Sequence, residues 1–424
     1  LQAVRLNINM NIDIQHRYTT SIFKIDIDQR LTLDNWLLYI LVVFAIGVGW
    51  LLGRRERQKR TETLGPNYYQ GLNYLLNEEP DRAVAPFIED LEVNADTLET
   101  HLALGSLLRR RGELEKAVIV HENILAHAEL ERDAMLQVQL ELARDYLLAG
   151  LLDRAEDLLL KLSQRENQDI GSIRRDAHKL MLEIYEREKE WHRAAEIGEL
   201  LAYGDESDKY ERFNSHYYCE IAEDLLKRNR TEEARQCISD AIGHDATNAR
   251  VSLLLGMLEL AEENYPEAIR AFQRIRDQES VYVVESLESL QTAYEKSDQP
   301  MDTFRAYLYE ALETTPSISI VLLLAQQIRE EKGDEGVSRF IADHLKKNPT
   351  IRGLTQLIDL HIDNAHGVSK QNLFILRSFA EALVADKPAY RCNGCGFEGK
   401  RMRWHCPSCK DWGTIKPIFG LEGE

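Results

Sequence analysis

The chain has 424 residues, of which 44% are hydrophobic and 29% are charged, and its formal net charge is −19. This balance is typical of a folded protein with more than one domain and excludes a largely disordered chain. The acidic charge argues against sequence-independent binding of nucleic acid, because such binding needs a basic face to replace the phosphate counterions. We therefore predict no nucleic-acid partner.

Residues 36–52 read WLLYILVVFAIGVGWLL and carry no charge. A helix of this length is at the short end of a bilayer span, and a Trp at each end suits the membrane interface. Because the basic run RRERQKR follows at once, the positive-inside rule places the rest of the chain in the cytoplasm. We expect a transmembrane helix at 34–53, after an external tail or upstream extension at 1–33 and before a basic linker at 54–66. A cleavable signal peptide is disfavoured, because the basic cluster follows the apolar run.

Residues 67–386 show no strand alternation and return to one helical pattern. A small residue is followed twelve positions later by Ala, and a large side chain often stands three positions after the small residue. Successive alanines are 34, 38, 39, 40 and 34 residues apart. The pairs are Gly71 and Ala83, Gly105 and Ala117, Ala143 and Ala155, Leu182 and Ala194 (with a larger first member), Ala222 and Ala234, and Gly256 and Ala268.

This spacing predicts helical hairpins that stack into a solenoid. Two antiparallel helices approach closely only where a small residue leaves room. One hairpin cannot bury its apolar face alone, so neighbouring hairpins must cover it. The pattern resembles the tetratricopeptide repeat, whose period is about 34 residues. We predict six clear repeats and eight or nine in all, with weaker units at 294–316 and 325–349, and with Glu259 as an exception at the large-residue position.

The predicted solenoid contains no set of residues that indicates catalysis. It has no HExxH, no Gly-rich phosphate loop and no GxSxG. We therefore predict that the chain is not an enzyme and that the repeats bind protein. Cys219 and Cys237 stand alone within the helical pattern, and we expect both to be small buried side chains, as free cysteines usually are.

Residues 392–409 read CNGCGFEGKRMRWHCPSC and contain two Cys-x-x-Cys pairs. The module at 387–424 is too short to fold on apolar burial alone. Disulfides are the poorer staple in a reducing cytoplasm, whereas four thiolates can close tetrahedrally around one ion. A thioredoxin-like redox pair is disfavoured, because no βαβ pattern surrounds the cysteines. The sequence thus predicts a metal site formed by Cys392, Cys395, Cys406 and Cys409.

The spacing of the cysteines does not determine which metal is bound. Both pairs resemble the knuckles of rubredoxin, which holds iron for electron transfer. Here Lys410 stands where rubredoxin has Gly, and the insert between the pairs is shorter, which should weaken the amide shell that tunes an iron couple. We therefore predict one structural zinc ion, with iron as the alternative, and we expect His405 to be a neighbour of the metal site rather than a ligand.

Three basic residues protrude from the insert between the cysteine pairs: Lys400, Arg401 and Arg403. The rest of the chain is strongly acidic. Our hypothesis is that these residues dock the module against the acidic solenoid or against a partner.

An apolar anchor, a basic flank, tetratricopeptide repeats and a rubredoxin-like tail ending in DWGTIKPIFGL occur here in that order. Over residues 36–424 this order resembles the lipopolysaccharide assembly protein B (LapB/YciM) family of Gram-negative bacteria. The fold class is then all-α: a repeat solenoid with an N-terminal transmembrane helix and a small C-terminal rubredoxin-like or zinc-ribbon module.

The resemblance implies a single-pass adaptor of the bacterial inner membrane with its C-terminal domain in the cytoplasm. Such an adaptor restrains lipopolysaccharide synthesis by helping the membrane AAA+ protease FtsH degrade the lipid A pathway deacetylase LpxC. An inner-membrane regulator of the PbgA/YejM type counteracts it. The implied roles are the membrane helix around Gly49 and Gly53 for membrane partners, the solenoid groove for the deacetylase and the metal module for structural support.

Two other functions stay open at this stage. One is a rubredoxin-type electron carrier, and the other is a general membrane-tethered chaperone or scaffold for envelope assembly. The sequence also leaves the oligomeric state open, a homo-oligomer included.

Overall fold

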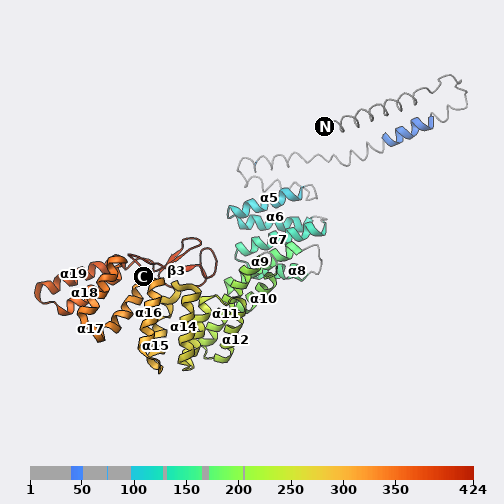
Figure 1. Cartoon of the computed structure of the whole chain (residues 1–424). Coiled ribbons are helices and arrows are strands. Elements are labelled where there is room, and N and C mark those ends of the chain that lie inside the picture. The colour runs from blue at the N-terminus through green and yellow to red at the C-terminus, as the bar shows by residue number, and fades with distance from the viewer. Residues whose placement is uncertain (1–39, 51–73, 75–96, 128–130, 165–170, 204–205) are drawn as a thin grey trace, which may run out of the picture. The chain divides into compact units, whose positions relative to one another are not determined.

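The structure is a computed structural model, and the residues it describes are 40–50, 74, 97–127, 131–164, 171–203 and 206–424 (Figure 1). The chain divides into two compact units, Leu1–Leu91 and Glu92–Glu424. The predicted tail at 1–33, the basic linker at 54–66 and the first repeat at Gly71 and Ala83 lie outside the described residues.

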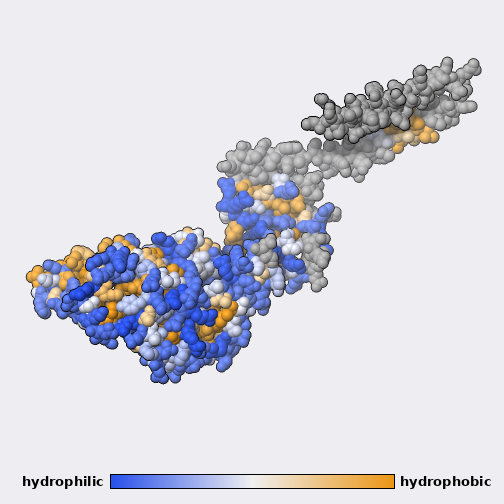
Figure 2. All heavy atoms as spheres, viewed as in Figure 1, coloured by the Kyte–Doolittle hydropathy of each residue, from blue (hydrophilic) through white to orange (hydrophobic). Residues whose placement is uncertain are grey.

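In the first unit, residues 40–50 form a helix whose side chains are mostly exposed, Phe44 and Trp50 among them. Figure 2 shows this helix as a hydrophobic group of atoms. Within the described ranges, no helix is both long enough and apolar enough to cross a membrane. The remaining positions of the predicted transmembrane segment 34–53 are not among those ranges.

The second unit is a series of helices that pack in chain order, each against the next, followed by a small sheet (Figure 1). The helices are α5 (Leu98–Arg110), α6 (Leu114–His127), α7 (Arg132–Leu148), α8 (Leu152–Ser163), α9 (Gly171–Glu188), α10 (Trp191–Leu201), α11 (Ser207–Lys227), α12 (Thr231–His244), α13 (Ala249–Ala261), α14 (Tyr265–Glu279), the 3-10 helix η3 (Ser280–Tyr282), α15 (Val283–Lys296), α16 (Met301–Thr314), α17 (Ile318–Lys347), α18 (Ile351–Asn364) and α19 (Gly367–Val384).

The small residues of the repeat lie where two helices of a hairpin touch. A Cβ added to Gly105 would come within 2.4 Å of the His121 ring, and one added to Gly256 within 2.4 Å of the Phe272 ring. The partner alanines are fully buried, which confirms the predicted close packing. They are Ala117, Ala155, Ala194, Ala234 and Ala268.

Each of these hairpins turns through one residue in the left-handed region, five positions before the buried Ala. The next N–H then donates to the carbonyl of the repeat's large residue, as Leu151 N does to Tyr146 O at 2.9 Å. This is the Schellman end of a helix, which satisfies carbonyls that would otherwise be left without a donor. The turn residues are Gly112, Gly150, Lys189, Asn229 and Glu263.

The described residues contain eight helix pairs when α17 is counted as two helices. Gly333 has φ 64° and ψ −173° and separates the halves of α17. The predicted weak units at 294–316 and 325–349 correspond to parts of the pairs α15–α16 and α17, and α18–α19 adds a further pair. The structure therefore confirms a tetratricopeptide-like solenoid for the residues it describes.

Glu259 departs from the repeat as predicted, whereas the expectation for Cys237 needs correction. Glu259, an exception to the repeat, is buried because its carboxylate accepts from Arg235 at 2.5 Å and from Asn264 at 3.0 Å. Burial raises the pKa of Glu259, but these hydrogen bonds and the charge of Arg235 outweigh burial and lower it. Cys219 is fully buried as expected, whereas Cys237 is only partly buried.

The C-terminal module is a three-stranded antiparallel sheet in the order β2-β1-β3. Its strands are β1 (Tyr390–Cys392), β2 (Glu398–Gly399) and β3 (Ile415–Pro417). The core of the module consists of Cys392, Cys406 and Ile415. So small a core confirms that apolar burial alone would not fold this segment.

Candidate metal centre

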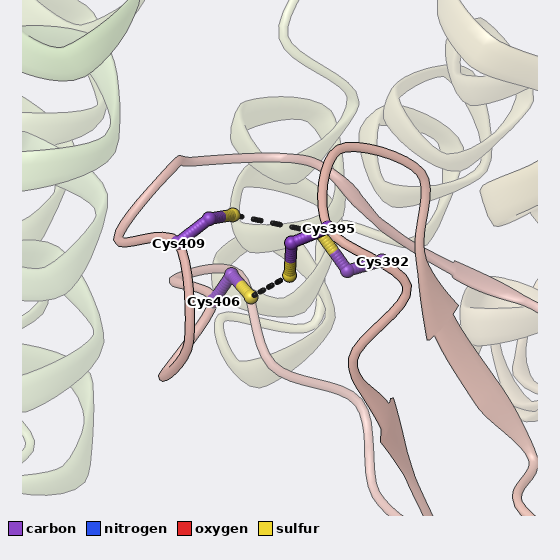
Figure 3. Close-up of side chains that lie close together, drawn as sticks. All are labelled: Cys392, Cys395, Cys406 and Cys409. Carbon is purple, nitrogen blue, oxygen red and sulfur yellow. Dashed lines mark hydrogen bonds between the residues drawn. The ribbon is translucent and has the colours of Figure 1, made fainter.

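The four predicted cysteines converge on one point (Figure 3). Their sulfur atoms all lie within 4.8 Å of one another. Cys392 Sγ is 3.7 Å from Cys409 Sγ, and Cys395 Sγ is 3.7 Å from Cys406 Sγ. Disulfide sulfurs would be about 2.05 Å apart, so these distances exclude bonded pairs.

These distances match those expected around a single tetrahedral ion. Metal–sulfur bonds of about 2.3 Å place the sulfurs of a tetrahedron about 3.8 Å apart. Each pair contributes one buried and one exposed cysteine: Cys392 and Cys406 are buried, whereas Cys395 and Cys409 are exposed. The donor set therefore fits a metal of the zinc or rubredoxin-iron type.

The two Cys-x-x-Cys loops share one backbone pattern. The residue after the second cysteine is left-handed in both loops, with φ 77° at Gly396 and 61° at Lys410. Its N–H donates to the carbonyl of the first cysteine, at 2.9 Å in the first loop and 3.0 Å in the second. In turn, the N–H of the first cysteine donates to a carbonyl just beyond the loop. Cys392 N–H donates to Phe397 O at 2.8 Å, and Cys406 N–H donates to Asp411 O at 2.9 Å.

Backbone amides point at the sulfurs of both loops. Burial raises the pKa of Cys392, but hydrogen bonds from Thr414 and from the N–H groups of Cys395 and Gly394 outweigh burial and lower that pKa to about 6. In the second loop, burial raises the pKa of Cys406, while N–H groups of Cys409 and Ser408 act in the opposite direction. These amides would stabilise bound thiolates.

The second loop corrects our expectation about Lys410. We expected a Lys in place of Gly to weaken the amide shell, yet Lys410 takes the left-handed conformation and the shell is retained. The identity of this residue therefore gives no reason to prefer zinc over iron. His405 lies beside the site: its Nε2 is 3.1 Å from the Lys410 carbonyl, and its ring stacks on Trp412 with the centroids 4.5 Å apart.

Trp412 attaches the metal module to the solenoid. It is 4% exposed, and its Nε1 donates to Glu186 Oε1 at 2.9 Å. The ring is stacked between His405 and His216 of α11, with centroid distances of 4.5 and 5.2 Å. Aromatic contacts of this kind add to the free energy of area burial. One side chain thus joins the second cysteine loop to two hairpins.

Further contacts continue along the solenoid. Tyr282 OH donates to the carbonyls of Gly413 and Ile415, at 3.0 and 2.9 Å. Tyr390 OH donates to Glu285 Oε1 at 2.9 Å. The module therefore lies against successive hairpins of the solenoid and covers part of their surface.

The extreme C-terminus is also fixed to the solenoid. Arg352 Nη1 donates to Glu424 Oε1 at 2.6 Å, and Ser317 Oγ donates to Glu424 Oε2 at 2.8 Å. The N–H of Ile351 donates to Leu421 O at 2.8 Å. These contacts extend the attachment to α17 and α18.

Of the three basic residues of the insert, only Lys400 contacts the predicted solenoid 67–386, and it does so at the last two residues of that range. Lys400 Nζ contacts only Ala385 O and Asp386, which lie just ahead of the module, at 2.9 and 3.3 Å. Arg401 and Arg403 are exposed and form no ion pair with the described residues. That part of the hypothesis is wrong for Arg401 and Arg403, because the docking is done by aromatic contacts, by hydrogen bonds and by ion pairs elsewhere in the module, those of Lys416 with Glu279 and of Glu424 with Arg352. The aromatic and polar ending DWGTIKPIFGL contains docking residues such as Trp412. The sequence alone did not show which residues of the solenoid this segment contacts.

Comparisons with known proteins agree with this geometry. A family model described as a rubredoxin metal binding domain matches residues 390–417, and a tetratricopeptide repeat model matches residues 219–280. Lipopolysaccharide assembly protein B of Escherichia coli (strain K12) is 34% identical over 393 residues, which cover 91% of this chain and 99% of that protein. The chain belongs to the lipopolysaccharide assembly protein B family.

A second relative in this family is the protein of the same name from Haemophilus influenzae. It is 29% identical over 399 residues, which cover 91% of this chain and 99% of its own length. Among solved structures, a tetratricopeptide repeat protein from Parabacteroides merdae is 14% identical, covers 63% of this chain and 99% of its own, and has a TM-score of 0.32. Family membership therefore depends on the sequence relatives and the metal-binding module.

Proposed function

We propose that this chain is a non-enzymatic adaptor that regulates lipopolysaccharide biosynthesis. It promotes degradation of the lipid A pathway deacetylase LpxC by the membrane protease FtsH, and a regulator of the PbgA/YejM type opposes it. The main support is membership in the lipopolysaccharide assembly protein B family over 91% of the chain. The repeat solenoid adds support, because such stacks of hairpins commonly bind proteins.

We further propose that the chain is anchored in the inner membrane with residues 67–424 in the cytoplasm. The uncharged run at 36–52 and the basic cluster at 54–60 support this orientation. The proposed division is a membrane helix at 34–53, a solenoid at 67–386 and a metal module at 387–424. Fusion of a cysteine reporter to each end, with labelling by a membrane-impermeant thiol reagent, tests the orientation.

The proposed role of Cys392, Cys395, Cys406 and Cys409 is to hold one zinc ion that folds the module. Zinc supplies no redox chemistry and closes a four-thiolate site as a structural element. The protein's own part is to direct amides at the sulfurs and to press the second loop against the solenoid through Trp412. The ion thereby stabilises the docked module and the surface it presents.

An electron carrier is the second candidate, because two observations favour it. The amide shell is retained in both loops, and Cys395 and Cys409 are exposed, as an iron site that exchanges electrons requires. An iron tetrathiolate is red and bleaches on reduction, whereas the zinc form is colourless. Absorbance of the purified chain before and after dithionite separates the two functions.

The lifetime of the deacetylase tests the adaptor function. In cells depleted of this protein, we expect the deacetylase half-life to lengthen several-fold and to recover on expression of the wild-type chain. Cys406→Ser should fail to restore it, whereas Gly243→Ala, at a position with nothing within 4 Å of an added Cβ, should restore it. An unchanged half-life after depletion would contradict the proposal.

A further inference from the structure

The last helix of the solenoid, α19, has an exposed apolar side. It packs on α18, and Ala380 is its one buried residue. At 3.6 residues per turn, five large apolar side chains of α19 fall within a strip about 100° wide, away from the side that holds Ala380. We call them the α19 strip, and each is between 51% and 71% exposed: Val368, Ile375, Leu376, Phe379 and Leu383. Figure 2 shows hydrophobic residues gathered at this end of the second unit, where Figure 1 labels α19.

An apolar strip is unusual at the end of a repeat solenoid. The terminal helix of such a stack normally has a polar outer face, because no further repeat covers it. Here the strip also contains the uncharged Asn372 but no charged residue. Arg377 of α19 lies outside the strip and is paired within the chain, with Asp359 at 2.8 Å and with Glu381 at 3.2 Å. The outer side of α19 therefore has the composition of a helix contact rather than of a solvated end.

The order of residues along the strip suits a second copy of the same helix. In an isologous contact the same surface meets itself across a two-fold axis, so the surface must be complementary to itself. With the axis between Ile375 and Leu376 and the two helices antiparallel, Ile375 lies beside the partner's Leu376. Val368 then lies beside the partner's Leu383, and Phe379 meets an uncharged position. No charge is brought into the contact.

The exposed area of the strip agrees with what a stable dimer needs. The five side chains leave roughly 500 to 600 Å² of apolar surface exposed, at the upper end for the largest patch on a typical monomer. A standard interface takes about 800 Å² from each partner and about 65% of a homodimer interface is apolar, so each copy supplies about 500 Å² of apolar surface. The strip provides this amount.

We propose that two copies of this chain dimerise through the α19 strip, with their α19 helices antiparallel across a two-fold axis. A membrane surface would also cover apolar side chains, but helices that lie on membranes are rich in Lys and Arg on their polar face. Helix α19 has only Lys370 and Arg377, and Arg377 is already paired. The inference goes beyond the proposed adaptor function and does not depend on it.

Photo-cross-linking of the full chain in isolated membranes tests the dimer. A photo-reactive benzoylphenylalanine at position 376 replaces one bulky apolar side chain of the strip by another. We expect irradiation to give a product with twice the mass of the chain, and mass spectrometry should locate the cross-link in α19 of the second copy. The inference is overturned if no such product forms, if the cross-link lies outside α19, or if the main product contains lipid or a different protein.

Two matched variants locate the contact. Phe379→Asp should lower the yield of the dimeric product at least tenfold, because the two-fold axis places a carboxylate in the apolar contact twice. Phe374→Asp makes the same change on the same helix outside the strip and should leave the yield within twofold. Both side chains are largely exposed, so the helix content and the metal content should match those of the wild type. An unchanged yield in Phe379→Asp, or an equal loss in Phe374→Asp, would refute the proposed contact.

Discussion

The solenoid and the metal module are stabilised by opposite arrangements. In the solenoid a fully buried Ala recurs at the same place in each hairpin from α5–α6 to α13–α14, and each hairpin packs mainly against its neighbours. The module has a core of three residues, one candidate ion site and a row of contacts to several hairpins. A destabilising substitution in the solenoid should therefore unfold only nearby hairpins, whereas loss of the ion or of a docking contact should destabilise the whole module.

Loss of the ion gives the largest expected effect. Structural zinc contributes roughly 10 to 16 kcal/mol in peptide models, far more than a core of three residues can replace. Chelation, or Cys406→Ser at the buried end of the second loop, should abolish amide protection across 388–424 and leave the helices of 131–164 protected. Hydrogen exchange read by mass spectrometry measures both regions in one experiment. Amide protection that persists across 388–424 after the metal is removed would contradict the claim that the ion stabilises the module.

Trp412→Ala should have the next largest effect. Truncation of a buried Trp costs about 3 to 5 kcal/mol, and here the Glu186 carboxylate also loses one of its two donors. We expect the module to keep its metal but to detach from the solenoid, so that exchange rises at Tyr217 and around Tyr282. Trp412→Phe should retain most of the stacking and show a smaller rise. Detachment is refuted if the alanine variant exchanges as slowly as wild type.

A smaller and local effect is expected inside the solenoid. Gly256→Ala places a Cβ against the Phe272 ring and should cost about 1 to 3 kcal/mol of unfolding free energy. Gly243→Ala meets no atom within 4 Å and should stabilise α12 by up to about 1 kcal/mol through helix propensity. Urea unfolding midpoints should thus move in opposite directions. Equal shifts of the two midpoints would show that close packing is not the reason for the small residue at position 256.

The cysteine loops offer a matched pair of substitutions. Lys410→Gly removes a left-handed strain worth about 1 kcal/mol, so metal should bind a few-fold more tightly. Gly396→Ala introduces the same strain in the first loop, so metal should bind more weakly by a similar factor. Competition with a chromophoric chelator measures both affinities. Identical affinities in the two variants would refute the equivalence of the loops.

The smallest effect is a pH dependence at the module interface. Burial raises the pKa of Glu285 above its usual value, although the hydrogen bond from Tyr390 acts in the opposite direction. A carboxyl whose pKa is raised by folding favours the folded state at low pH and loses that contribution as the pH rises through its folded pKa. Glu285→Gln should therefore be slightly more stable than wild type at pH 7 and equal to it near pH 4. Melting temperatures of the variant and of the wild type, measured at pH 7 and at pH 4, test this difference.

Much of the solenoid could be predicted because its determinants are periodic and local. The spacing between Gly256 and Ala268 follows from the steric needs of one hairpin, so it is visible without any long-range information. The cysteine site was predictable for a similar reason, since two short loops with thiolates have few other uses.

The attachment of the module could not be predicted. Trp412 and Glu186 are 226 residues apart, and nothing in either local pattern points to the other. The ion pair of the buried Glu259 with the partly exposed Arg235 is likewise set by packing between hairpins. Charge led to the wrong docking residues at Arg401 and Arg403, because long-range charge balance says nothing about which side chains are buried at a contact.

Metal content of the purified full chain is the most direct test of the central claim that four cysteines hold one structural zinc ion. Elemental analysis should find one zinc per chain in a colourless wild-type protein and none in Cys406→Ser. A wild-type chain that is folded without metal would contradict the claim, and so would a red protein with one iron that bleaches on reduction.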